Sequence, residues 1–371
     1  MKFSCNQQTL SKALNTVSKA VTSKTTIPIL KGILLQATKE GKLILSASDL
    51  DLSIEKTIDG VHVEEEGSAV VLSKLFTDII RKLPNEEILI ERQDENIAIK
   101  TPRSEFVVVG LPSEEFPNIG DIKEFEKLSI DKEIFKSMIR KSVFCASVDE
   151  SKGIITGVLI ELEENSIRVA ALDGFRMAVI TEEMKNEESK KIIIPAKILQ
   201  DIYKIIAELE EEESLTFVLG DKKAVIMLEN VKIMLRLLNG EFIKYKDIIP
   251  KENKCVIKAA RVELFESIER AALLSKEGKN NLIKLSTSEN SLTITSRSDE
   301  GTVREETRIE REGEDIEIGF NSKYLLDVLK VLDEEEIVLE MNTSVKPCLI
   351  KPVSGESFKY LVLPVRISAG Q

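Results

Sequence analysis

Histidine, tryptophan and cysteine are scarce in this sequence of 371 residues, and their scarcity argues against several kinds of site. The chain has one histidine, His62, no tryptophan, and four widely separated cysteines, Cys5, Cys145, Cys255 and Cys348. Without a Cys-x2-Cys pair, neither a zinc finger nor a disulfide framework is expected. His62 lies in the polar segment 59–67, and nothing nearby suggests a Ser-His-Asp triad. We expect buried, reduced thiols, a surface histidine, no catalytic residue and no metal site.

Long apolar runs and phosphate-binding loops are also missing. No apolar run approaches the roughly 20 residues that span a bilayer, and the first residues lack the apolar core of a signal peptide. We therefore expect a cytoplasmic protein. A P-loop requires Gly-Lys followed by Ser or Thr, but Gly-Lys at 41–42 and 278–279 is followed by Leu and Asn. This excludes ATP hydrolysis by that route, and we expect no cofactor.

Aromatic residues make up only 5% of the chain, and its net charge is −12. Proteins that bind nucleic acid are usually basic, but the charge of this chain is segregated. Residues 1–39 contain six lysines and no acid, whereas acids gather at 64–66, 210–213 and 334–336. Lysines on helices without interleaved aromatic rings suit loose contact with a phosphate backbone. We expect weak binding to duplex DNA without sequence preference.

Repetition is what the chain has in abundance. The pattern Lys-x3-Asp-x2-Lys or Arg occurs in three expected helices, at Lys74, Asp78 and Arg81, at Lys197, Asp201 and Lys204, and at Lys323, Asp327 and Lys330. Its three positions share one helix face. One such face is usually only solvated, but three copies beside basic helices at 7–21 and 132–146 favour contact with DNA. From these helices we predict that the DNA-facing residues include Lys12, Lys74, Arg140, Lys141, Lys197, Lys204 and Lys323.

Other landmarks recur with the same period of about 125 residues. The expected strand at 32–37 returns at 157–162 and 281–286, and Asp49 of the next hairpin returns as Asp173 and Asp299. Asp49 and Asp51 could hold Mg²⁺ in a nuclease. However, a carboxylate needed once for chemistry has no reason to occur three times. A role in the hairpin turn explains Asp49 better.

The order of elements within one repeat predicts the fold class. Runs of strands with alternating apolar residues are interrupted by only two helices per repeat, which indicates an α+β fold and not parallel βαβ units. Repeats close near 116–121 and 245–254. We predict three repeated domains at residues 1–126, 127–252 and 253–371, each with antiparallel sheets and two helices.

Four motifs add a family resemblance: TIPILKGILL at 26–35, ALDGFRMA at 171–178, GFNSKYLLDVL at 319–329 and YLVLPVRI at 360–367. With the threefold repeat, they make the chain resemble the bacterial DNA polymerase III beta subunit family, the sliding clamps. The resemblance implies a non-catalytic processivity factor, a head-to-tail homodimer whose DNA-clamp domains form a ring around double-stranded DNA. It also implies three kinds of partner: the alpha subunit of the replicative polymerase, the clamp loader, and other replication and repair proteins.

The resemblance further implies one hydrophobic pocket per subunit that binds partner peptides. The matching positions are Ile155, Leu172, Gly174, Phe175, Arg176, Met177, Ile243, Ile248, Asn321, Tyr324, Val345, Val362, Leu363, Pro364, Val365 and Arg366. The family usually has Thr and His at Leu172 and Phe175, Pro at Ile243, and often a basic residue at Asp247. These departures predict a more apolar and less basic pocket than is usual in the family.

The resemblance also extends the other two predicted surfaces. Lys24 and Lys152 match DNA-contacting positions, and Val108, Leu273 and Leu274 match positions at the subunit interface. Pairing of edge strands across two subunits would extend the sheet and cover an exposed edge. Only residues 368–371 lie beyond the resemblance.

Two other functions stay open at the level of sequence. A repeat scaffold that binds only proteins would keep its function when Lys24, Lys197 and Lys323 are neutralised. A metal-dependent nuclease would cleave DNA with Mg²⁺ and lose that activity on Asp49→Asn.

Overall fold

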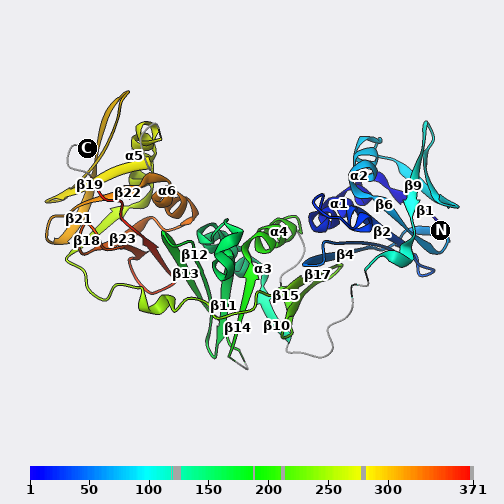
Figure 1. Ribbon diagram of the computed structural model, residues 1–371, viewed down its shortest axis with the longest axis horizontal. Helices are drawn as coiled ribbons and strands as arrows, with labels where there is room; N and C mark the ends of the chain where they lie inside the picture. Colours follow the sequence, from blue (N-terminus) through cyan, green and yellow to red (C-terminus); the bar gives the residue numbers. More distant parts are fainter. Residues whose placement is uncertain (118, 120–126, 187–188, 210–213, 277–280, 368–371) are drawn as a thin grey trace. The chain divides into compact units, whose positions relative to one another are not determined.

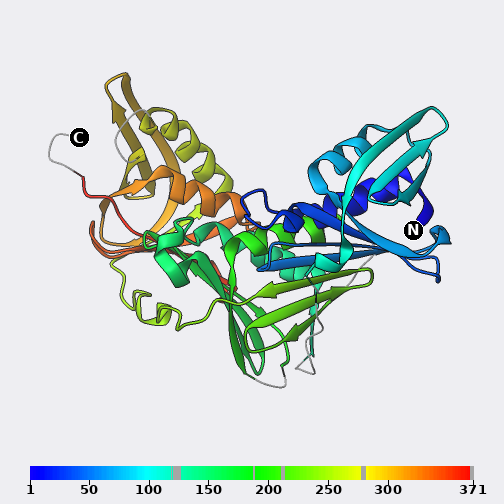
Figure 2. The ribbon, with the colours of Figure 1, turned by 45° about the vertical axis from the view of Figure 1, so that its right-hand side comes forward.

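The structure is a computed structural model of the chain. It describes all residues except 118, 120–126, 187–188, 210–213, 277–280 and 368–371. Contacts divide the chain into two compact units: unit 1 is residues 1–133 with 204–237, and unit 2 is residues 134–203 with 238–371. Each unit combines helices with antiparallel sheet (Figures 1 and 2). The predicted α+β class is confirmed.

Unit 1 is built on a sheet of thirteen described strands. In sheet order they are β10 (Lys127–Asp131), β15 (Ser214–Leu219), β16 (Lys223–Leu228), β17 (Val231–Arg236), β4 (Leu52–Ile58), β3 (Leu43–Ser48), β2 (Gly32–Ala37), β6 (Gly67–Leu72), β9 (Ser104–Leu111), β8 (Asn96–Thr101), β7 (Glu87–Gln93), β1 (Lys2–Asn6) and β5 (His62–Glu65). The pairing of β17 with β4 places Leu235 opposite Leu52, so strands far apart in sequence share one sheet.

Helices α1 (Gln7–Val17) and α2 (Ser73–Lys82) pack against each other and against β3, β4 and β6 (Figure 1). α1 begins at Asn6, whose side chain accepts hydrogen bonds from the backbone N–H groups of Gln8 and Thr9. Such a cap satisfies donors that have no partner within the helix. Leu10, Leu14 and Val17 recur at helical spacing on the buried face of α1.

Unit 2 is built on a second sheet, of twelve described strands. In sheet order they are β14 (Lys190–Pro195), β11 (Gly157–Glu163), β12 (Ser166–Leu172), β13 (Arg176–Glu183), β25 (Phe358–Val362), β24 (Cys348–Pro352), β23 (Glu336–Met341), β18 (Cys255–Ala260), β21 (Gly301–Gly313), β20 (Ser291–Ser298), β19 (Leu282–Ser288) and β22 (Glu317–Asn321). Like β4 and β17, the paired strands β13 and β25 come from stretches that are far apart in the sequence.

The remaining helices are α3 (Lys132–Ser142), α4 (Ala196–Ala207), α5 (Arg261–Ser275) and α6 (Ser322–Val331). Short 3₁₀ segments are η1 (Ser18–Ala20), η2 (Pro28–Lys31), η3 (Ser113–Glu115), η4 (Val143–Cys145), η5 (Glu150–Thr156) and η6 (Tyr245–Asp247). α5 packs on β19, β20 and β21 and against α6 (Figure 1). Two helices were predicted in each repeat, and all six predicted helices are present.

Several single-residue predictions are confirmed. The four cysteines are buried and free, and His62 is exposed. The Asp49 carboxylate accepts hydrogen bonds from the backbone N–H groups of Asp51 and Leu52, at 3.0 and 2.7 Å, as the turn role requires. Asp173 does the same at the next repeat. No helix in the described part of the chain is long and apolar enough to cross a membrane.

Three sequence features lie outside the described residues: most of the predicted boundary near 116–126, the acidic run 210–213 and the tail 368–371.

Candidate functional site

The hairpin between β12 and β13 forms the centre of the candidate peptide site. Asp173 accepts hydrogen bonds from the N–H groups of Phe175 and Arg176, at 2.8 and 3.0 Å. Gly174 has φ of +95°, a backbone conformation that residues other than glycine rarely adopt. The tight turn leaves the Phe175 side chain 56% exposed.

The Arg176 guanidinium is held on every side. Its Nε donates to Asp173 Oδ2 at 3.0 Å, its Nη1 to Asp327 Oδ2 at 2.6 Å and its Nη2 to the carbonyl of Phe144 at 2.8 Å. The guanidinium also lies over the Phe144 and Tyr324 rings, at 5.3 and 4.8 Å from their centroids. Burial acts to lower the pKa of Arg176, but the two carboxylates outweigh it and raise the pKa. Arg176 therefore offers a fixed planar surface and not an unpaired charge.

Apolar side chains surround this arginine; Phe175 and Leu363 are exposed, whereas Leu172, Met177 and Val362 are buried. The Phe175 and Tyr324 rings stack with centroids 6.2 Å apart, and the N–H of Leu363 donates to the carbonyl of Phe175 at 2.8 Å. In the β13–β25 ladder Val362 lies opposite Arg176. The structure thus brings together many of the predicted pocket residues: Leu172, Gly174, Phe175, Arg176, Met177, Tyr324, Val362 and Leu363.

Some of the other predicted pocket residues lie next to these side chains, and the rest make none of the contacts described above. Ile155 packs against the buried cluster that contains Leu172 and Met177. Ile243 and Ile248, 43% and 46% exposed, flank η6 in the segment that leads to β18. Further along the chain, Asn321 caps α6, Val365 donates its N–H to the carbonyl of Gly319, and Pro364 lies between Leu363 and Val365. Val345 and Arg366 are exposed, and the contacts above include neither.

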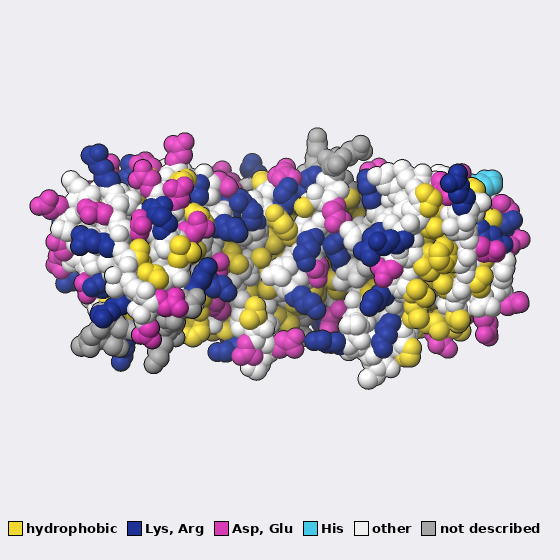
Figure 3. Space-filling view, turned by 90° about the horizontal axis from the view of Figure 1, so that it is seen from above, with side chains coloured by type: hydrophobic (Ala, Val, Ile, Leu, Met, Phe, Trp, Pro, Cys, Tyr) yellow, Lys and Arg dark blue, Asp and Glu magenta, His cyan; other side chains and the backbone are white. Residues whose placement is uncertain are grey.

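The predicted DNA-facing cations fall into two groups. Exposed on the surface are Lys12, Lys24, Lys74, Lys152, Lys197, Lys204 and Lys323. Arg140 and Lys141 instead bind the Asp333 carboxylate, at 2.5 and 3.4 Å, and their charge is partly neutralised. Figure 3 shows basic side chains on one face of each unit, beside apolar and acidic ones.

The repeated Lys-x3-Asp-x2-Lys pattern does not give three identical solvated faces. In α2, Asp78 pairs with Arg81 at 2.6 Å, along the helix. In α6, Asp327 forms an ion pair with Arg176, and Lys323 and Lys330 are exposed. The spacing of the repeat did not predict this ion pair, because Arg176 lies on β13, far from α6 in the sequence. Sequence reasoning also missed Phe144, which gave no signal of its own.

The inner strands β9 and β21 each leave part of one edge open in the described part of the structure. β9 pairs with β8 along residues 104–109 and reaches β6 only at Gly110 and Leu111. β21 pairs with β20 along residues 301–308 and with β18 only at 309–313. On β9, Val107 and Val109 are 58% and 66% exposed and Val108 is partly exposed, while Leu273 on α5 is 66% exposed. An apolar patch is visible on unit 1 in Figure 3.

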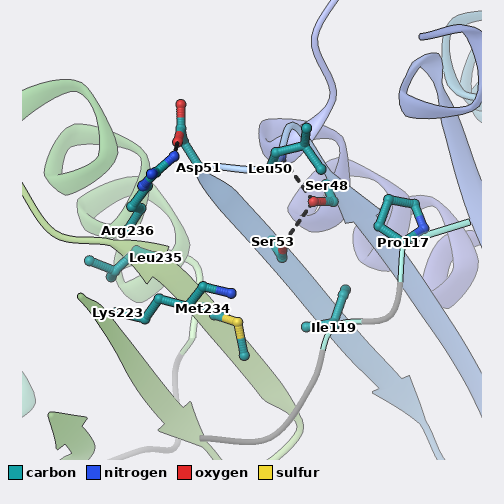
Figure 4. Close-up of a pocket in the computed structure, with 10 residues that line it drawn as sticks. All are labelled: Ser48, Leu50, Asp51, Ser53, Pro117, Ile119, Lys223, Met234, Leu235 and Arg236. Atoms are coloured by element: carbon teal, nitrogen blue, oxygen red, sulfur yellow. Dashed lines mark hydrogen bonds and ion pairs between the residues drawn. The ribbon is translucent and has the colours of Figure 1, made fainter. Parts of the chain in front are cut away.

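A small cavity of about 80 Å³ lies in unit 1 beside the β4–β17 pairing (Figure 4). Ser48 and Ser53 share a hydrogen bond there, and Asp51 lies 3.5 Å from Arg236. By the repeat, this place corresponds to the β13–β25 pairing of unit 2. In the repeat, Leu52 is the position that corresponds to Arg176. Unit 1 therefore lacks the arginine that the carboxylates and aromatic rings surround in unit 2.

Family models account for most of the chain. They describe the DNA polymerase III beta subunit: the N-terminal domain matches residues 1–120, the central domain 129–244 and the C-terminal domain 246–366. The chain belongs to this family. Its members are the beta sliding clamps, non-catalytic processivity factors of DNA polymerase III, and the chain has this function. The predicted family and function are confirmed.

Individual family members match over their full length. The beta sliding clamp of Staphylococcus aureus is 33% identical over 377 residues, covering 99% of each chain. A crystal structure of a putative beta subunit from Eubacterium rectale is 35% identical with a TM-score of 0.93. The sliding clamp of Bacillus subtilis is 34% identical with a TM-score of 0.94. Both structures match 99% of this chain and 100% of their own. Family membership implies a homodimer that works with a polymerase.

Proposed function

We propose that two copies of the chain join head to tail into a ring that encircles duplex DNA without reading its sequence. The observation that carries the proposal is the exposed lysine at the same place in three repeated helices: Lys74 in α2, Lys197 in α4 and Lys323 in α6. A ring needs only weak, sequence-independent attraction inside, because its topology retains the DNA. Exposed lysines supply such attraction.

The open edges of β9 and β21 supply the contact between the two copies. A strand edge with unpaired N–H and C=O groups pairs readily with another strand. Pairing of residues 104–109 of one copy with 301–308 of the other would join the two sheets and cover Val107 and Val109. The predicted contacts at Val108, Leu273 and Leu274 belong to this interface. Because the two edges differ, the contact is head to tail, and a closed dimer contains it twice.

Partner proteins bind, in this proposal, to the apolar surface around Phe175, Met177 and Leu363. Aliphatic and aromatic anchors of an extended peptide fit such a surface. Leu172, Phe175 and Ile243 make it more apolar than the family usually has. The proposed partners are the alpha subunit of the replicative polymerase, the clamp loader and other replication and repair proteins. The domains are those predicted at 1–126, 127–252 and 253–371, which the ranges of the family models support.

Retention on DNA tests the ring. The protein is loaded onto a nicked circular plasmid with a clamp loader and ATP, free protein is removed, and the plasmid is cut once. We expect the protein to stay on the uncut circle and to leave the linear molecule. Equal retention on both would mean that ordinary contacts hold the DNA, and Mg²⁺-dependent cleavage of the plasmid would support the nuclease alternative.

A further inference from the structure

A cleft of about 400 Å³ opens on the sheet of unit 2, within the size range of ligand sites. None of the surfaces above uses it. Its lining residues are Arg168, Val179, Thr181, Tyr245, Lys246, Ile249, Pro250, Lys251, Glu356 and Lys359. Four cations and one carboxylate thus line a cleft in a chain whose net charge is −12. A local charge opposite to that of the whole chain favours an anionic ligand.

The cleft shares one face of the sheet with part of the proposed peptide surface, the part that contains Leu172 and Met177, whereas Arg176 and Val362 point to the opposite face. Met177, Val179 and Thr181 alternate along β13 and therefore point to the same side. On β25, Leu361 lies opposite Met177, and Lys359 lies opposite Val179. This face is apolar at its Met177 end and charged at its Thr181 end. The two ends are roughly 13 Å apart, the length of four residues in a strand.

The chain segment 242–251 borders both places. Phe242, Tyr245 and Ile249 pack on the buried cluster beneath the face, which includes Met177. Ile243 and Ile248 of the proposed peptide surface lie just before and just after η6, while Lys246 and Lys251 border the cleft. A peptide bound at the first place therefore has the second within reach of a few extended residues.

A buried ion network fixes the wall of the cleft. The Glu161 side chain is 2% exposed; it accepts a hydrogen bond from the Tyr245 hydroxyl and lies 2.7 Å from Lys191 Nζ. Arg168 binds both oxygens of Glu163, at 2.8 and 3.3 Å. Lys246 also lies 3.2 Å from Glu163, so these carboxylates offset the charge of Arg168 and Lys246, which serve mainly to hold the wall.

Two lysines are more available to a ligand. Lys251 is exposed and has no hydrogen bond or ion pair with any described residue. Lys359 pairs at 2.9 Å with Glu356, whose side chain is 77% exposed. The Lys359 side chain itself is 25% exposed, and because Glu356 is solvated, Lys359 exchanges this partner for another at little cost.

We propose that this cleft binds an acidic segment of the same partner peptide whose apolar anchors occupy the surface around Met177. The inference rests on that proposed peptide site and adds a charge requirement to it. The shared face and the shared border segment connect the two places, and the cations supply the selectivity. Partner peptides with glutamates or aspartates a few residues from their anchors bind more tightly than uncharged ones.

Peptide titrations by fluorescence anisotropy test the inference. The probes are the tail peptide of the polymerase alpha subunit alone, and the same peptide with four glutamates or four glutamines added through a four-residue Gly-Ser spacer at either end. We expect glutamates at one end to tighten binding roughly three- to tenfold over glutamines, because each exposed ion pair contributes little. The gain shrinks with added salt.

The double variant Lys251→Glu/Lys359→Glu reverses the charge of the two more available cations. We expect it to lose the glutamate gain while binding the unextended peptide as the parent does, which also shows that it is folded. Lys39→Glu/Lys42→Glu, in the other unit, makes the same charge change and keeps the gain. A gain absent at both ends, or retained in the cleft variant, overturns the inference alone. A parent protein that does not bind the unextended peptide overturns the peptide site and the inference together.

Discussion

Glu161 shows how one residue combines burial with charge. Burial acts to raise the pKa of this carboxyl, but hydrogen bonds from Lys191 and Tyr245 and the charge of Lys246 outweigh it, and the pKa lies below its ordinary value. A carboxylate with a lowered pKa stabilises the folded state above its unfolded pKa. That stability is lost as the pH falls through the folded pKa.

Glu161→Gln is therefore expected to destabilise the protein by about 2 kcal/mol near pH 7, because it removes a buried charge from its partners. The difference from the parent should shrink as the pH falls below about 4.5, the ordinary carboxyl value, and should be lost at the lower pH where the folded parent is also protonated. Urea unfolding midpoints between pH 7 and pH 3 measure this. Glu310→Gln, at a carboxylate 78% exposed, is the control and should change little. A destabilisation independent of pH would contradict the role assigned to the charge.

For single residues, the sequence predicted local roles, such as turn formation, better than contacts with distant residues. The repeat explained why Asp49 and Asp173 sit in hairpin turns, because their bonds are local. The partners of Arg176 were not predictable. Asp327 lies 151 residues away, and Phe144 contributes a backbone carbonyl that every residue possesses. Contacts between distant segments leave no periodic or local signal in the chain.

At the scale of elements, the six helices were predictable because their apolar residues recur at helical spacing and each pattern occurs once in each of the three repeats. Their starts differ, however. Asn6 caps α1 and Asn321 caps α6 with their side chains, whereas Leu72 precedes α2 and makes no such bond. The strand pairings β4–β17 and β13–β25 were not predicted, because alternation shows which residues face inward but not which strand lies alongside.

Asn6→Ala should lower the stability of unit 1 by about 1 kcal/mol, since the first turn of α1 loses its cap. Asn6→Asp keeps an oxygen that accepts the same two backbone hydrogen bonds, and it should cost much less. Thermal unfolding of the three proteins measures the difference. Equal losses in both variants would assign the effect to the bond between the Asn6 and Asn85 side chains, which either change removes.

At the scale of the whole molecule, assembly is expected to depend on strand edges and not on large apolar faces. Residues 104–109 expose valines beside unpaired backbone groups, and glutamate there would bury a charge without a partner in the proposed contact. The family implies a homodimer but does not say which strands of this chain form it.

Val107→Glu should raise the dissociation constant of the dimer roughly 10- to 100-fold, because a charge loses its water on assembly. Analytical ultracentrifugation over a dilution series measures this. Val353→Glu makes the same change at a valine 50% exposed outside both edges, and it should leave the dimer intact. Dimers of equal strength in both variants would place the contact elsewhere.

The two long-range pairings also bear on the synthesis of the chain. Leu52 of β4 pairs with Leu235, and Met177 of β13 pairs with Leu361, 183 and 184 positions later. A ribosome adds about 5 to 20 residues per second, so each strand waits roughly 10 to 40 s for its neighbour. During this interval the nascent polypeptide carries an unpaired edge that a neighbouring nascent chain can occupy. The sheets that span distant segments therefore make the growing chain a natural client for the chaperones that meet it at the ribosome.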